Sequence, residues 1–159
     1  MRYNTKYFRS KEIPLNHPIS EVYQHIVESV PRSIAHAEGA VLHRLNETEQ
    51  ILLPVAVVGN IAPGNRSIKI EVGKGAAGLA LAIGTTIKVS DILMDSRIIP
   101  PIPGTPIRSL LVSPLCSTMG YVGTLSAQSS KPDVFTDEDA LLLETLASQA
   151  VKDLEGMSI

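Results

Sequence analysis

The sequence contains few of the residues that most often carry redox chemistry, base stacking or membrane insertion. Among 159 residues there are one cysteine (Cys116), no tryptophan and two phenylalanines. A single thiol cannot form a disulfide within the chain, which favours a reducing compartment and a cytoplasmic location. No apolar run approaches the about 18 residues of a membrane-spanning helix, so no membrane association is expected.

The sequence also lacks an excess of basic charge. Fourteen Lys and Arg face sixteen Asp and Glu, which gives a net charge of −2. Nucleic-acid binding is therefore not expected, because it depends on neutralising phosphates. None of the four histidines is paired with another at helical spacing, so no metal site is expected. No serine lies in a nucleophile-elbow context, and no catalytic residue is assigned.

The length and the 44% hydrophobic content predict one globular domain. Residues 1–17 read as an irregular N-terminal arm, and residues 18–156 as the single domain. The arm is positively charged but has no apolar stretch behind it, so it does not have the pattern of a secretory signal.

Two segments near the ends of the chain show helical periodicity. Apolar residues from Ile19 to Val30 form one stripe, and Pro31 is expected to kink or break that helix. Thr136 is predicted to cap the last helix. Because the apolar positions of this helix cover more than one stripe, Leu142 and Leu146 are left for a second surface.

Between these helices the pattern predicts two β-hairpins, at 40–45 with 50–58 and at 108–115 with 121–128, and brief strands at 68–72 and 85–90. Pro54 suggests a bulge or an edge position. Hairpins mean antiparallel pairing, so the fold class is α+β with an antiparallel sheet. The successive apolar residues from Leu110 to Val112 indicate a sheet that is covered on both faces.

The segment Gly73-Lys-Gly-Ala-Ala-Gly78 has the glycine spacing of a dinucleotide-binding loop, and Asp91 follows Gly73 by 18 residues. However, Gly84 ends the following helix after about two turns, whereas a crossover between parallel strands needs a dozen residues or more. The rest of the chain then offers a hairpin and one helix instead of further βαβ units. We therefore interpret the glycines as turn and close-packing residues.

Three motifs together resemble the GAF domain family. They are Val72-Gly-Lys-Gly-Ala-Ala-Gly-Leu-Ala-Leu-Ala-Ile-Gly84, Ile107-Arg-Ser-Leu-Leu-Val-Ser-Pro-Leu115 and the segment 122–139, and the resemblance covers about residues 19–155. It implies a profilin-like central sheet of about six antiparallel strands, with terminal helices on one face. Short helices and loops would cover the other face and enclose a pocket. Most GAF domains bind small molecules or dimerise in signalling, and few are enzymes.

The resemblance also bears on cofactors. Free-methionine sulfoxide reductases are similar to GAF domains but use several cysteines, and a disulfide relay needs two thiols. Covalent bilin attachment is not expected, because no cysteine lies between residues 92 and 115. The cyclic-nucleotide pattern is matched only in part, by Ser130-Lys131, Phe135 and Asp139-Ala140. The ligand itself stays unknown.

If the resemblance holds, a pocket lies between the sheet and residues 73–107. Arg97 and Arg108 are candidate contacts for an anionic ligand, although surface ion pairs are an equally good interpretation. Neutral hydrogen bonds would come from Ser109, Thr124, Ser126 and Gln128. The candidate apolar walls are Leu42, Val58, Leu79, Ile83, Leu93 and Leu111.

Three functional hypotheses follow. The first is a non-enzymatic GAF sensory or regulatory domain that binds a small molecule and signals as a homodimer through its terminal helices. The second is a GAF module that binds nothing and serves for dimerisation or interaction. The third is a redox or nucleotide enzyme on the same scaffold.

Overall fold

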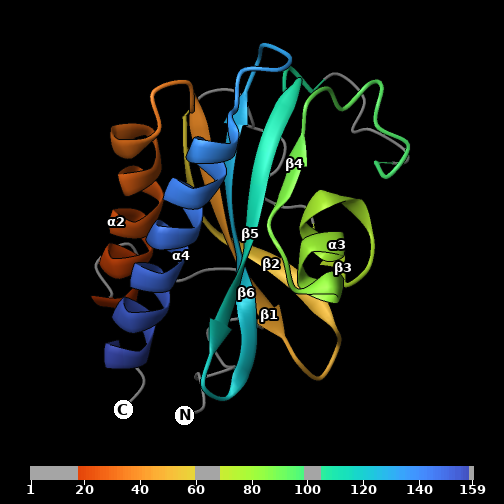
Figure 1. Ribbon diagram of the computed structural model, residues 1–159. Helices are drawn as coiled ribbons and strands as arrows, with labels where there is room; N and C mark the ends of the chain where they lie inside the picture. The colour runs from red at the N-terminus through yellow and green to blue at the C-terminus, as the bar shows by residue number, and fades with distance from the viewer. Residues whose placement is uncertain (1–17, 60–68, 99–104, 158–159) are drawn as a thin grey trace.

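The computed structural model describes residues 18–59, 69–98 and 105–157. Six antiparallel strands form one sheet in the order β3-β2-β1-β6-β5-β4. Helices α2 (Pro18–Ser33) and α4 (Asp137–Met157) lie side by side on one face, and α3 (Gly75–Ile83) lies on the other (Figure 1). The α+β class, the six antiparallel strands and the placement of the helices are confirmed. The strands are Gly39–Asn46 (β1), Ile51–Val58 (β2), Ile70–Glu71 (β3), Ile87–Val89 (β4), Ser109–Ser117 (β5) and Gly120–Ser129 (β6).

Both predicted hairpins are present, β1 with β2 and β5 with β6. In the first hairpin Leu42 pairs with Ala56 and His43 with Pro54, so Val55 is an extra residue on β2. This is the bulge expected at Pro54. The brief strands β3 and β4 are shorter than the predicted runs 68–72 and 85–90, and residue 68 lies outside the described residues. They form opposite edges of the sheet.

The terminal helices follow the sequence signals with one exception. Thr136 and Asp139 exchange backbone-to-side-chain hydrogen bonds of 2.9 and 3.1 Å before α4, a capping box that satisfies two free amides. The break expected at Pro31 does not occur, because α2 continues to Ser33. Pro31 lies in the last turn, where its missing amide costs a single hydrogen bond, and the Ile34 amide still donates to Val30 at 2.9 Å.

The glycine segment is a turn and a helix start, as interpreted from the sequence. Gly73 and Gly75 have φ angles of 92° and 63°, which residues with a side chain rarely adopt. A Cβ on Gly78 would collide with the backbone oxygen of Glu71, so only glycine lets α3 approach β3 this closely. Since α3 joins the two edges of an antiparallel sheet, no parallel dinucleotide-binding unit is formed.

The sheet separates two apolar clusters. Between the sheet and helices α2 and α4 lies the larger core, which includes Tyr23, Val27, Leu42, Leu111, Leu125 and Leu143. The cluster under α3 is smaller and includes Leu52, Ala77, Ala80, Leu81, Ile87 and Val112. Among the described residues, no helix combines the length and apolar character needed to cross a bilayer.

Candidate functional site

A row of polar side chains lies on the face of the sheet that α3 partly covers. Side chains alternate between the two faces of a strand, and Leu125 and Ala127 of β6 pack in the helix-side core. Thr124, Ser126 and Gln128 therefore face the other way. Directly opposite them on β1 lie His43, Val41 and Gly39. We call His43, Thr124, Ser126 and Gln128 the polar row.

The polar row is buried, and three of its four members hold an atom without a hydrogen-bond partner among the described residues. His43, Thr124 and Gln128 are 5%, 0% and 5% exposed. His43 Nδ1, Thr124 Oγ1 and Gln128 Oε1 have no hydrogen-bond partner among the described residues. Ser126 alone is satisfied, since its hydroxyl donates to the Val41 carbonyl at 3.3 Å. Each unpartnered buried polar group costs about 1–3 kcal/mol by mutational measures, so three on one face call for an explanation.

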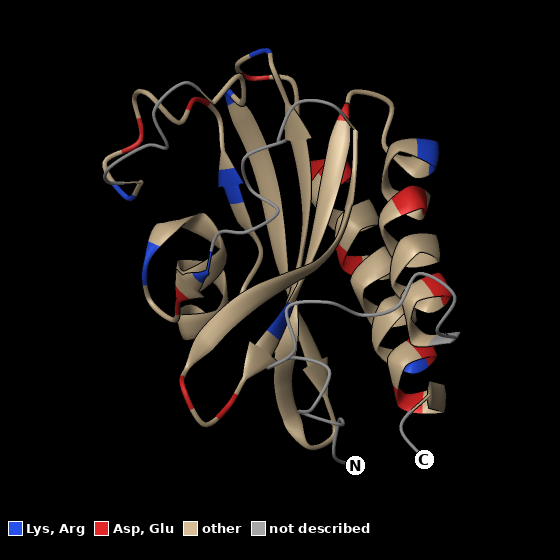
Figure 2. Cartoon of the chain, turned by 180° about the vertical axis from the view of Figure 1, so that it is seen from behind, with Lys and Arg blue, Asp and Glu red and all other residues tan. Residues whose placement is uncertain are grey.

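Burial also determines the protonation state of His43, the titratable member of the row. Removal from water lowers the pKa of His43 to about 4, because desolvation disfavours the imidazolium. His43 is therefore neutral near pH 7 and has one donor and one acceptor nitrogen. Figure 2 shows the charged residues mostly on the helices and at strand ends and turns, while most of the sheet carries neither colour. The row can thus offer hydrogen bonds to an uncharged polar group without adding a net charge.

The structure brings together only part of the set predicted from the sequence. Thr124, Ser126 and Gln128 are members of the polar row. Half-buried Leu79 packs in the cluster under α3. Leu42, Val58 and Leu111 instead pack in the core between the sheet and the terminal helices. They face away from α3, because successive side chains of a strand point to opposite faces and these three occupy the positions that point to the terminal helices.

Other predicted residues are engaged elsewhere or exposed. Arg108 and Arg97 pair with Asp91 and Asp95, each at 2.6 Å, as in the surface ion-pair interpretation. Hydrogen bonds from these arginines lower the pKa of both carboxyl groups. The Ser109 hydroxyl donates to the Lys131 carbonyl at 2.6 Å, which ties β5 to the loop before α4. Leu93 and Ile83 are 61% and 54% exposed.

His43 is the member of the row that sequence reasoning missed, because the histidines were considered only as metal ligands. The sequence does contain an indication that His43 is buried. In the strand-like run 40–45, His43 alternates with the apolar residues Val41 and Leu45, so the three side chains share one face. A histidine at such a position is buried and uncharged. The described residues hold no group of three or more His, Cys, Asp or Glu side chains that is placed to bind a metal ion.

The described elements form a small α+β domain, with an antiparallel sheet between the terminal helices and α3. The chain belongs to the GAF domain family, whose model matches residues 16–152. No curated protein sequence matches the chain.

Solved structures share the fold. A GAF domain from a phosphoenolpyruvate-protein phosphotransferase of Coxiella burnetii aligns with a TM-score of 0.76 at 16% identity, covering 89% of this chain and 85% of that one. The free methionine-R-sulfoxide reductase of Neisseria meningitidis, solved with its substrate, aligns with a TM-score of 0.73 at 24% identity, covering 86% and 77%. The GAF-B domain of DevS from Mycobacterium smegmatis gives 0.68 at 22% identity, covering 87% and 94%. At such identities the likeness concerns the fold.

Proposed function

We propose that this chain is a non-enzymatic GAF regulatory domain that binds a small, uncharged, polar molecule on the α3 face of the sheet. The observation that carries the proposal is the polar row, in which His43, Thr124 and Gln128 each hold a buried atom that no described residue hydrogen-bonds. A ligand with matching donors and acceptors would satisfy these atoms and offset the cost of burying them. This is the face on which the sequence predicts a pocket, between the sheet and residues 73–107.

The position of Cys116 supports a binding role over redox catalysis. The chain has one cysteine, and it lies exposed near the end of β5, outside the polar row. A disulfide relay needs a second thiol, which this sequence does not supply. The similar reductase of N. meningitidis therefore supports the scaffold and not the reaction. Turnover of free methionine sulfoxide by the purified chain would contradict this assignment.

The test is a thermal-shift screen of uncharged metabolites against the natural chain and Thr124→Val. A ligand present at about 100 times its Kd stabilises the folded state by about 2.7 kcal/mol, which raises Tm measurably. The shift is expected to shrink strongly in Thr124→Val and in Gln128→Leu. Thr145→Val, the same change on exposed α4, should keep it. A ligand whose shift survives in both polar-row variants binds elsewhere and would refute the site.

We also propose that the domain self-associates through its terminal helices. Leu142 on α4 is 43% exposed, with half-buried Leu146 one turn later, and such a stripe favours an apolar contact. Sedimentation across a range of concentrations tests this: Leu142→Glu should shift the chain towards monomer. A natural chain that stays monomeric at every concentration would rule the contact out.

A further inference from the structure

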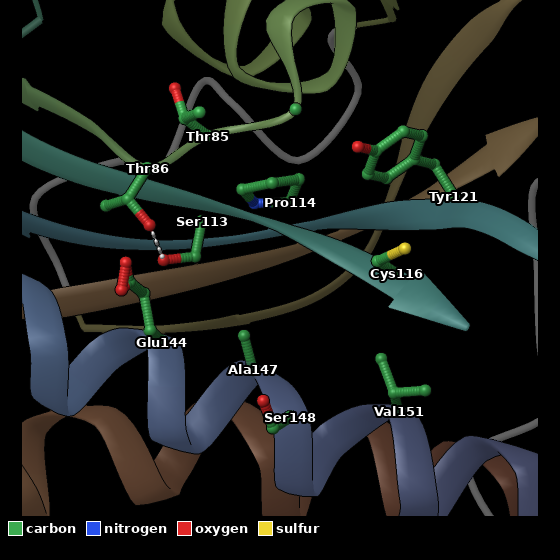
Figure 3. Close-up of a pocket in the computed structure, with 11 residues that line it drawn as sticks. Thr85, Thr86, Ser113, Pro114, Cys116, Tyr121, Glu144, Ala147, Ser148 and Val151 are labelled. Carbon is green, nitrogen blue, oxygen red and sulfur yellow. Dashed lines mark hydrogen bonds between the residues drawn. The ribbon is translucent and has the colours of Figure 1, made fainter. Parts of the chain in front are cut away.

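A hollow lies away from the polar row, at the edge of the sheet between β5 and α4. It has a volume of about 380 Å³ and is drawn in Figure 3. We call it the edge groove. One wall is α4, which contributes Glu144, Ala147, Ser148 and Val151, and the other consists of Gly84, Thr85, Thr86, Ser113, Pro114, Cys116 and Tyr121.

The backbone beside the edge groove is suited to an extended segment. β4 pairs only with Leu110–Val112 of β5, so residues 113–117 of β5 have no strand beyond them among the described residues. An open strand edge offers backbone groups to an extended chain, here carbonyl acceptors and the amides of residues other than Pro114, which has no N–H. At the end of this edge nearest β4, the hydroxyl groups of Thr86 and Ser113 form a hydrogen bond of 2.8 Å (Figure 3).

The side chains of the edge groove favour a basic and apolar occupant. Glu144 is the charged residue of its lining, beside the apolar surface of Pro114, Val151 and Tyr121. Helix α4 as a whole carries six acidic residues and one basic residue, Lys152. Two exposed apolar side chains neighbour lining residues in the sequence: Leu141, one turn before Glu144, and Met119, in the β5–β6 turn.

The chain itself contains a segment of complementary chemistry. Residues 1–17 lie outside the described residues, and their sequence has four basic residues, Arg2, Lys6, Arg9 and Lys11, against one acidic residue, Glu12. They also hold Tyr3, Tyr7 and Phe8, three of the six aromatic residues of the whole chain. Such a density of basic and aromatic residues fits a groove lined by the carboxylate of Glu144 and by the apolar surface of Pro114, Val151 and Tyr121.

The segment is long compared with the groove. The segment joins α2 at Pro18, at the same end of the molecule at which α4 ends (Figure 1). Seventeen extended residues reach up to roughly 55 Å. The stretch of α4 from Glu144 to Val151 is only about 10 Å long at 1.5 Å per residue.

We propose that residues 1–17 dock in the edge groove of their own chain, with basic side chains beside Glu144 and aromatic side chains against Pro114, Val151 and Tyr121. The proposed occupant of the groove is therefore the N-terminal segment of the same chain. The proposal does not depend on the ligand proposed for the polar row.

Cys116 is a built-in reporter, because it lines the groove and is the single thiol of the chain. The experiment measures its alkylation rate by an uncharged reagent, iodoacetamide, in the folded full-length chain. Phe8→Ala and the double variant Arg9→Glu/Lys11→Glu are each expected to raise the rate about two- to fivefold, the effect of losing one partly exposed contact. Unchanged rates in both would overturn the proposal.

Glu144→Lys provides the decisive comparison. In the natural background it should raise the alkylation rate, because it repels the basic segment. In the Arg9→Glu/Lys11→Glu background it should lower the rate, because the ion pairs reform with reversed sign. A direct effect of the new lysine on the thiol would raise the rate in both backgrounds, and that result would overturn the docking.

Two controls complete the design. Glu49→Lys makes the same charge change in the exposed β1–β2 turn and should leave the rate unchanged; a rise equal to that of Glu144→Lys would refute a local contact. The protection should also be independent of protein concentration. Protection that grows with concentration would assign the groove to a second copy and overturn docking within one chain.

Discussion

The two faces of the sheet bury polar groups in different ways. On the helix side the largest buried polar side chain is Arg44, whose guanidinium donates to the Tyr23 hydroxyl at 3.0 Å and the Val122 carbonyl at 3.2 Å and lies 5.7 Å from the Tyr23 ring centre. Asn46 Nδ2, which has the same strand parity as Leu42 and Arg44, is the one atom on this side that is buried without a partner among the described residues. On the α3 side three atoms of the polar row are in that position, so more hydrogen-bonding capacity is left over there. That difference separates a structural face from a candidate binding face.

Truncation in the helix-side core should have the largest effect. Leu125→Ala is expected to lower the free energy of unfolding by about 2–5 kcal/mol, because it leaves a cavity among side chains that cannot collapse. Leu125 is fully buried between the sheet and the helices. Urea denaturation measures the change, with Leu93→Ala, whose side chain is 61% exposed, as the control. A cost no greater than that of the control would mean that this face is loosely packed.

Acid should act on the other face through His43. Its pKa is lowered from 6.5 to about 4 in the folded state, so between these values the unfolded chain binds more protons than the folded one. Stability contributed by neutral His43 is full above about pH 6.5 and falls by about 3 kcal/mol as the pH drops towards 4. Unfolding free energies across this range should show the slope in the natural chain and in His36→Gln. His43→Leu should reduce it, and an unaltered slope would place His43 in contact with water.

The smallest expected effect is opposite in sign. Thr124→Val removes a fully buried hydroxyl without a partner and should stabilise the ligand-free chain by about 1 kcal/mol. The same denaturation assay measures it, next to Thr86→Val, which breaks the hydrogen bond to Ser113 and should destabilise the chain. If Thr124→Val is clearly destabilising, the hydroxyl has a partner in solution and the contrast between the faces disappears. A gain in stability with loss of ligand binding would be typical of a functional site.

Much of the fold could be predicted because its determinants are local. The apolar stripe of α2, the Thr136 cap and the turn signals of both hairpins act within a few residues, and the structure follows them. Pro31 shows the limit of that reasoning. Its effect depends on where the helix ends, which is decided by the surroundings and not by the proline.

The candidate site was predicted less well, because a site depends on which face each side chain takes. Leu42 and Leu111 were expected as pocket walls, but their parity on β1 and β5 turns them towards α2 and α4. His43 was not expected, although it lies directly opposite Thr124. Arg108 was left with two interpretations, and the structure shows its ion pair with Asp91.

The sequence by itself therefore determined the class of fold, the order of the elements and the rejection of a dinucleotide-binding unit, since periodicity, caps and helix length are properties of contiguous residues. The tertiary structure alone decided which polar groups are buried without partners among the described residues, and which residues join Cys116 in lining the edge groove. Those properties depend on the pairing of residues far apart in the chain, such as His43 with Thr124, which are separated by 81 residues. No local sequence pattern encodes such a pairing.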